Sequence, residues 1–145
     1  MIPIHNSDFY KTDHRSQYPK GTQFVYSNMT ARGSRIKGLN YTVFFGLQYF
    51  IKKYLIDDFN ENFFNRPKGE VVSRYKRRLD NALGIDAVSM GHIEELHDLQ
   101  FLPIEIKALP EGTLVPLRIP YFTIENTLEN FAWLTNFLET IISAS

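Results

Sequence analysis

The sequence predicts an α+β fold, with a small antiparallel or mixed sheet and packed helices, in a single domain over residues 1–145. Segments with strand and helix patterns are grouped along the chain and do not alternate regularly. Proline and glycine separate these segments, and 43% of the residues are hydrophobic. That content is enough for one buried core in a chain of this length.

The first half of the chain predicts one strand, one loop and one amphipathic helix. Thr22–Met29 alternates as a strand does, and Ala31–Asn40, with two glycines and three basic residues, predicts a loop. The helix that follows is indicated by apolar side chains at i, i+3, i+4 spacing: Val43, Phe44, Leu47, Phe50, Ile51, Tyr54 and Leu55.

The middle of the chain predicts two further helices. Asn65–Gly69 interrupts the pattern, and a polar helix is predicted over Glu70–Leu83, before Gly84. A shorter helix is predicted over Gly91–Leu99. Basic residues gather between Arg66 and Arg78, and we interpret them as the solvated face of a helix.

Extended structure is predicted from Leu102 to Thr123. Ile104–Ala108 alternates apolar and charged residues, and Pro110–Gly112 has the residues of a tight turn, so a hairpin with Thr113–Val115 is expected. Because proline cannot donate to a strand ladder, Pro116 and Pro120 predict that only edge or irregular extended structure follows.

The last segment predicts a helix capped by Asn126 or Thr127. One face of it is apolar: Leu128, Phe131, Leu134, Leu138 and Ile141.

Composition excludes several classes of protein. The chain has no cysteine, which excludes disulfides, thiolate metal sites and cysteine nucleophiles. No apolar run approaches the roughly 18 residues of a membrane span, and the first residues lack the pattern of a signal peptide. Lys and Arg number 16 and Asp and Glu 16, a balance that is not typical of nucleic-acid binders. A cytoplasmic protein with no membrane or nucleic-acid partner is therefore expected.

Short catalytic motifs are absent. His92 and His97 are five residues apart and miss the i, i+4 spacing of a helical zinc pair, so no metal site is predicted. No GxSxG, Walker A or GxGxxG pattern occurs. The loop Ala31–Lys37 places Arg32, Arg35 and Lys37 around a Gly-Ser pair, which would suit a phosphate but also suits a plain exposed loop.

The N-terminal segment has two interpretations. Tyr10 would be presented to a flat ligand, with Asp8 and His14 as hydrogen-bond partners. The same residues also suit a short helical turn with Ser7 or Asp8 as its N-cap.

Several collinear motifs resemble the nicotinamide phosphoribosyltransferase family. They are Asp8-Phe9-Tyr10-Lys11, His14, Gln17-Tyr18-Pro19, Val25-Tyr26-Ser27 with Arg32, Thr42–Tyr49, Leu102–Pro116, Phe122–Thr127 and Trp133–Thr140. They keep the family's order over nearly the whole chain. Only about Asp57–Gln100 shows no family motif.

The resemblance implies a transfer of phosphoribosyl from phosphoribosyl pyrophosphate to nicotinamide, with Mg²⁺, giving nicotinamide mononucleotide and pyrophosphate. It implies a homodimer in which Tyr10 stacks on the pyridine ring across the subunit interface. Asp8 would lie beside that ring, and Arg32 would reach a phosphate in trans. These are expected to be substrate-binding residues, with no catalytic residue in this chain.

The family's α/β barrel takes about 200 residues or more, so it is not contained in these 145 residues. The chain is therefore expected to be the N-terminal domain of a type II phosphoribosyltransferase, truncated before the barrel. Alone it is expected to be inactive, with Mg²⁺ and phosphoribosyl pyrophosphate bound mainly by the missing barrel.

Three other functions are alternatives. The first is a fragment of a nicotinate phosphoribosyltransferase, because the residues that choose between amide and acid lie in the barrel. The second is a non-catalytic binding or regulatory module, in which the final helix docks within the domain and does not leave Trp133 and Phe137 exposed. The third is a nucleic-acid binder that uses Arg66–Arg78.

Overall fold

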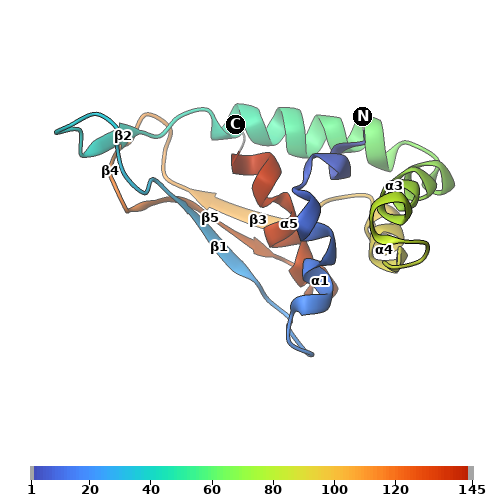
Figure 1. The fold of residues 1–145 in the computed structure, drawn as a ribbon. Helices are drawn as coiled ribbons and strands as arrows, with labels where there is room; N and C mark the ends of the chain where they lie inside the picture. The colour runs from blue at the N-terminus through green and yellow to red at the C-terminus, as the bar shows by residue number, and fades with distance from the viewer. Residues whose placement is uncertain (1, 144–145) are drawn as a thin grey trace.

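The computed structural model describes residues 2–143 and confirms the α+β fold of small antiparallel sheets and several helices. One sheet has three strands in the order β1-β5-β3, and a second pairs β2 with β4 (Figure 1). Both are antiparallel. The strands are β1 (Tyr26–Thr30), β2 (Tyr41–Val43), β3 (Ile104–Ala108), β4 (Leu114–Pro116) and β5 (Pro120–Asn126).

Helical segments make up the rest of the fold, and the final one packs on β5 and β1 of the three-stranded sheet (Figure 1). They are η1 (Pro3–Asn6), η2 (Phe9–Asp13), α1 (His14–Gln17), α2 (Leu47–Phe50), η3 (Ile51–Asp57), η4 (Asn60–Phe64), α3 (Lys68–Leu83), α4 (Gly91–Leu99), η5 (Glu129–Phe131) and α5 (Ala132–Ser143). None of the helices within residues 2–143 is long and apolar enough to cross a membrane.

One continuous helix connects the two ends of the molecule. It begins as α2 and continues as π-helix through η3 and η4 (Figure 1). A π-helix has more residues per turn than an α-helix, so side chains four apart remain on one face. Leu55, Phe59 and Phe63 are buried on that face. The predicted helix is confirmed from Leu47 onward. Of its predicted buried face, Val43 lies in β2 and is exposed, Phe44 precedes the helix, and Tyr54 is exposed.

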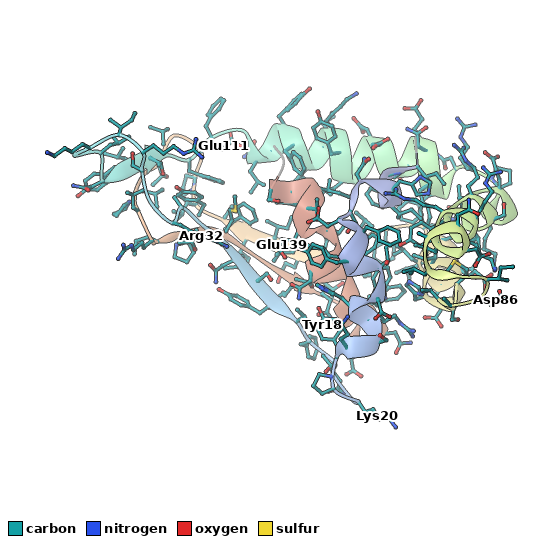
Figure 2. The ribbon with its side chains drawn as sticks, viewed as in Figure 1. Tyr18, Lys20, Arg32, Asp86, Glu111 and Glu139 are labelled. Carbon is teal, nitrogen blue, oxygen red and sulfur yellow. The ribbon has the colours of Figure 1, made fainter. Side chains whose placement is uncertain are left out.

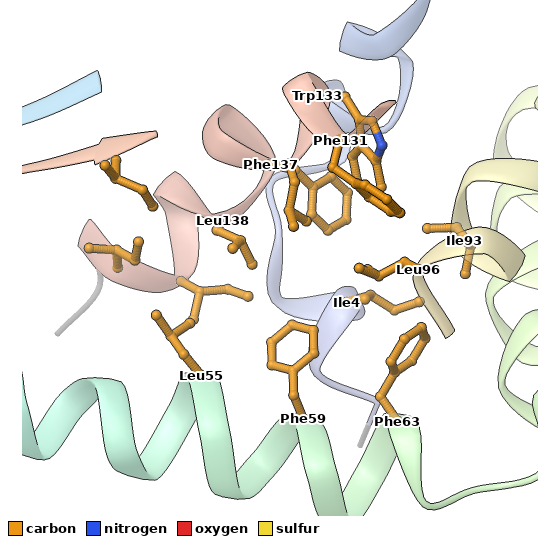
Figure 3. Close-up of a cluster of buried hydrophobic side chains, with 14 of the residues drawn as sticks. Ile4, Leu55, Phe59, Phe63, Ile93, Leu96, Phe131, Trp133, Phe137 and Leu138 are labelled. Atoms are coloured by element: carbon orange, nitrogen blue, oxygen red, sulfur yellow. The ribbon is translucent and has the colours of Figure 1, made fainter. Parts of the chain in front are cut away.

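The core lies where this helix meets α5, α4 and the N-terminal segment. Figure 3 shows Phe59 and Phe63 of the long helix facing Leu138 of α5, Leu96 of α4 and Ile4 of η1. All five are at most 1% exposed. Segments from both ends of the chain therefore share one hydrophobic core.

The helices predicted in the middle of the chain are confirmed. α4 has the predicted bounds, and α3 begins two residues earlier than predicted and ends before Gly84 as expected. The basic residues of α3 are largely exposed, and ion pairs with acids one turn away involve Arg74 and Lys76. The interpretation as a solvated helical face is confirmed.

The predicted hairpin is wrong. β3 pairs with β5, and β4 pairs with β2, so the two segments joined by Pro110–Gly112 enter different sheets. The turn itself forms, with the Thr113 N–H donating to the Pro110 oxygen over 3.2 Å. Local turn residues therefore determined the bend but not the partner of either strand.

β5 also differs from the prediction, because it is the central strand and not an edge. Pro120 is its first residue, where a missing N–H removes little from the ladder. The register with β1 shifts at Met29 and Thr30, the position that faces Pro120. β1 itself begins four residues later than predicted, at Tyr26.

Asn126 does not cap the final helix. It ends β5, and its buried amide group makes three hydrogen bonds. Its Oδ1 accepts from the Val25 N–H over 2.8 Å, and its Nδ2 donates to the oxygens of Gln23 and Leu128 over 2.8 and 2.9 Å. Asn126 thus links the residues just before β1 with the residue just before η5.

The final helix docks inside this fold. Trp133, Phe137 and Leu138 are each at most 5% exposed. α5 therefore does not present the exposed apolar face that would indicate a missing partner. Of the predicted stripe, only Leu128, which precedes the helix, is exposed.

His92 is a titratable group inside this core. Its ring meets the Trp133 indole edge-on, with centroids 4.8 Å apart, and its Nδ1 has no hydrogen-bond partner. Burial, together with the charge of Arg15, lowers the pKa of His92 to about 4. His92 is therefore neutral in the folded chain at neutral pH.

Substitution Asn126→Ala should lower the free energy of unfolding by about 2–3 kcal/mol, because it removes the three hydrogen bonds of a buried amide. Urea unfolding measures the change. Asn130→Ala, at an exposed asparagine four residues away, is the control and should change stability by less than about 0.5 kcal/mol. Equal stability of the two variants would contradict this assignment.

The protonation of His92 should make the fold less stable in acid. Below pH 6.5 the unfolded chain binds a proton at His92 that the folded chain binds only near pH 4, so stability falls as pH falls through this window. The loss reaches about 3 kcal/mol at full effect. In His92→Phe, which keeps a ring against Trp133, urea unfolding between pH 7 and 4 should show a smaller loss. An unchanged pH dependence would refute the prediction.

Candidate functional site

The short helix η2 presents Tyr10 at the surface. The Tyr10 side chain is 62% exposed, and its ring lies 5.1 Å from the His14 ring, at an angle of 58°. Asp8 precedes η2 and is also exposed. Asp8 occupies the N-cap position of η2, as one interpretation predicted, but its side chain makes no capping hydrogen bond.

Three contacts hold this segment on α5. Ser7 Oγ donates to the Phe137 oxygen over 2.7 Å, and the Asp8 N–H donates to Thr140 Oγ1 over 3.1 Å. The buried Lys11 side chain ends 3.2 Å from the Glu139 carboxylate. The buried Ser7 and Lys11 stand on either side of the exposed residues, so the backbone is held while Asp8 and Tyr10 face solvent. Figure 2 shows Glu139 on α5 beside the N-terminal helices.

The surroundings of Tyr10 shift the pKa of its phenol upward. Contact with the protein surface, followed by the carboxylates of Asp8 and Glu139, raises the pKa of the Tyr10 phenol above its ordinary value. A neutral aromatic face next to a carboxylate can stack on a flat ring and accept a hydrogen bond from it.

Arg32 lies in a different part of the molecule, just after β1 (Figure 2). It lines a shallow groove of about 570 Å³ between loop 31–40 and the residues that follow β4. Lys37 and Arg118 line the same groove. Arg35, which the sequence groups with Arg32 and Lys37, is exposed but does not line it.

Two backbone hydrogen bonds shape this groove. The Arg118 N–H donates to the Ala31 oxygen, and the Leu117 N–H donates to the Asn40 oxygen, both over 2.9 Å. They join residues 116–118 to the first and last residues of the loop. The loop is therefore closed at its base, and its cationic side chains project from a defined frame.

The structure brings Asp8 and Tyr10 together and leaves Arg32 apart from them. Asp8 lies close enough to Tyr10 to hydrogen-bond its phenol and to shift its pKa, whereas no interaction joins Arg32 to either residue in the described part of the chain. Tyr10 and Arg32 therefore do not share one local site among the residues that the structure describes.

The histidines do not form a metal site. His97 Nε2 lies 2.9 Å from the Arg66 oxygen, while His92 packs against Trp133. Within residues 2–143, no three His, Asp or Glu side chains are placed to hold a metal ion.

Sequence reasoning missed Glu139 and Arg118. Glu139 lies 128 residues from Lys11 in the chain, and the local pattern around Arg118 is only that of an extended segment between two prolines. The signal for Arg118 is its backbone, because its φ of 68° is in the left-handed region, and that signal exists only in the structure.

Comparison with known proteins points to one family. The family model described as "Nicotinamide phosphoribosyltransferase, N-terminal domain" matches residues 3–106. That range includes Asp57–Gln100, where the sequence by itself shows no family motif.

Three curated relatives bear the name nicotinamide phosphoribosyltransferase. The protein of Acinetobacter baylyi is 54% identical, over 98% of this chain and 29% of its own length. Those of Xanthomonas campestris pv. campestris and Mycoplasma genitalium are each 33% identical, over 94% and 93% of this chain. The chain spans less than a third of the length of these relatives.

Proposed function

Because the chain belongs to the nicotinamide phosphoribosyltransferase family and matches its N-terminal domain, we propose that it is the N-terminal part of an enzyme of NAD salvage. The enzyme transfers phosphoribosyl from phosphoribosyl pyrophosphate to nicotinamide, giving nicotinamide mononucleotide and pyrophosphate. The observation that carries this proposal is the exposed pair Asp8 and Tyr10, held on α5 by contacts of Ser7, the Asp8 N–H and Lys11.

In this proposal Tyr10 stacks on the nicotinamide ring. Stacking orients the flat ring toward the ribose and adds no charge to the site. The Asp8 carboxylate accepts a hydrogen bond from the carboxamide N–H. The exposed position of Tyr10 supports this role, since its ring face is accessible to a flat ligand.

Arg32 binds a phosphate of the substrate or product. Its guanidinium donates two hydrogen bonds in the geometry that phosphate oxygens accept. Both Tyr10 and Arg32 are exposed, which supports a homodimer in which they complete the active site of the partner subunit.

The residues of this chain do not fit a Mg²⁺ site, since no cluster of three suitable side chains occurs among residues 2–143. Mg²⁺ would enter with phosphoribosyl pyrophosphate and be held mainly by the barrel beyond this single N-terminal domain. A cytoplasmic location fits substrates of this kind.

Nicotinate is the alternative substrate, and Asp8 disfavours it. The carboxylate of nicotinate would lie near the Asp8 carboxylate, and two like charges repel each other. Nicotinamide is neutral and carries N–H donors, so the same position favours the amide.

A chimaera tests the function. This chain replaces the corresponding 29% of the Acinetobacter baylyi relative, and nicotinamide mononucleotide is assayed by chromatography. The chimaera should form the product from nicotinamide with Mg²⁺, and the 145-residue chain alone should form none. Turnover that scales with the concentration of the isolated chain would refute its dependence on the barrel. A folded dimeric chimaera without turnover would favour a non-catalytic module.

The site residues are tested in the same chimaera. Tyr10→Ala should raise KM for nicotinamide by about tenfold through lost stacking, with a smaller effect on the other substrate. Arg32→Ala should raise KM for phosphoribosyl pyrophosphate by tenfold or more, about the effect of a lost charge-assisted pair. Arg77→Ala, on the exposed face of α3, removes a charge elsewhere as the control. Unchanged kcat/KM in both site variants would contradict the assignments.

A further inference from the structure

The end of the molecule that carries Arg32 has an unbalanced positive charge. No acidic residue occurs between Asp13 and Asp57, nor between Glu111 and Glu125. These two stretches supply every residue that lines the groove between loop 31–40 and residues 116–118. The groove therefore contains cations and no carboxylate.

The cations of this groove have no ion-pair partner among residues 2–143. Arg32, Lys37 and Arg118 line one groove, and none of them forms an ion pair with a residue that the structure describes. On α3, by contrast, Lys76 pairs with Asp80 and Asp86. Three unpaired cations around one groove repel each other, and a bound anion would relieve that repulsion.

The backbone of Arg118 gives an independent indication. Its φ of 68° lies in the left-handed region, which glycine adopts without strain and arginine does not. The hydrogen bond from its N–H to the Ala31 oxygen, and the one from the Ile119 N–H to the Pro116 oxygen, hold this conformation. A strained backbone at a residue with a charged side chain points to a function for that side chain.

We propose that Arg118, with Lys37, extends the phosphate site of Arg32 into a diphosphate-binding groove. One guanidinium can bind one phosphoryl group, and a second from the opposite wall can bind the next. The proposal rests on the proposed function, because it names the part of the substrate that this end of the molecule binds. Two anions carry a diphosphate in that reaction: phosphoribosyl pyrophosphate before transfer and pyrophosphate after it.

The 145-residue chain itself serves for the test. Inorganic pyrophosphate, phosphoribosyl pyrophosphate and nicotinamide mononucleotide are titrated separately at constant ionic strength and followed by amide chemical shifts. Both diphosphates should bind saturably and shift the amides of residues 31–40 and 117–119, and the mononucleotide, with one phosphate, should bind more weakly. Tighter binding of phosphoribosyl pyrophosphate identifies the substrate as the occupant, and tighter binding of pyrophosphate identifies the product.

Arg118→Gly is the decisive variant. Glycine suits the left-handed backbone, so the fold should be kept or stabilised while pyrophosphate affinity falls about tenfold, the effect of losing one charge-assisted contact. Arg118→Lys should restore part of the affinity, and Arg77→Ala, which removes an equal charge from α3, should leave it unchanged. Affinity in Arg118→Gly equal to that of the parent, or a loss as large in Arg77→Ala, would overturn the proposal.

The two proposals fail separately. Suppose that the chimaera is active, and that Arg32→Ala weakens pyrophosphate binding while Arg118→Gly does not. The proposed function is then supported and the extended groove is refuted. If Arg118→Gly weakens pyrophosphate binding and the folded chimaera forms no nicotinamide mononucleotide, the diphosphate-binding groove is supported and the enzymatic function is refuted. Absence of saturable pyrophosphate binding to the chain overturns the groove, whatever the activity of the chimaera.

Discussion

The contact between the N-terminal segment and α5 determines where Asp8 and Tyr10 lie. η2 has five residues, and a helix that short is not stable in water without tertiary contacts. Its position comes from the hydrogen bonds to α5 and from the ion pair of Lys11 with Glu139. Because α5 is itself fixed in the core, a surface site for a flat ring depends on the packing of the whole fold.

The proposed phosphate site depends on where the charged residues lie and not on the net charge of the chain. The chain is neutral overall, yet the loop after β1 and the turn after β4 bring basic residues together without an acid between them. α3 also carries basic residues, but two of them, Arg74 and Lys76, pair with acids one helical turn away. What separates a candidate phosphate site from a solvated helix is thus the absence of a nearby carboxylate.

The sequence could predict only those candidate site residues that are near neighbours in the chain. Asp8 and Tyr10 are two residues apart and belong to a motif that resembles the family, so both could be named in advance. Arg118 lies 86 residues after Arg32, and no pattern within the chain connects them. The tertiary structure brings the two segments together through the pairing of β2 with β4 and the backbone hydrogen bonds from Arg118 to Ala31 and from Leu117 to Asn40.

The sequence by itself determined the α+β class, the long helix, α3, α4, the strand Ile104–Ala108 and the turn at Pro110–Gly112, because helical periodicity and turn chemistry act between near neighbours. Only the tertiary structure decided which strands pair. β5 reaches the centre of its sheet because burying Phe122 and Ile124 against α5 outweighs the weak local preference expressed by the prolines before it. Strand partners depend on contacts between residues far apart in the chain, and local patterns do not encode those contacts.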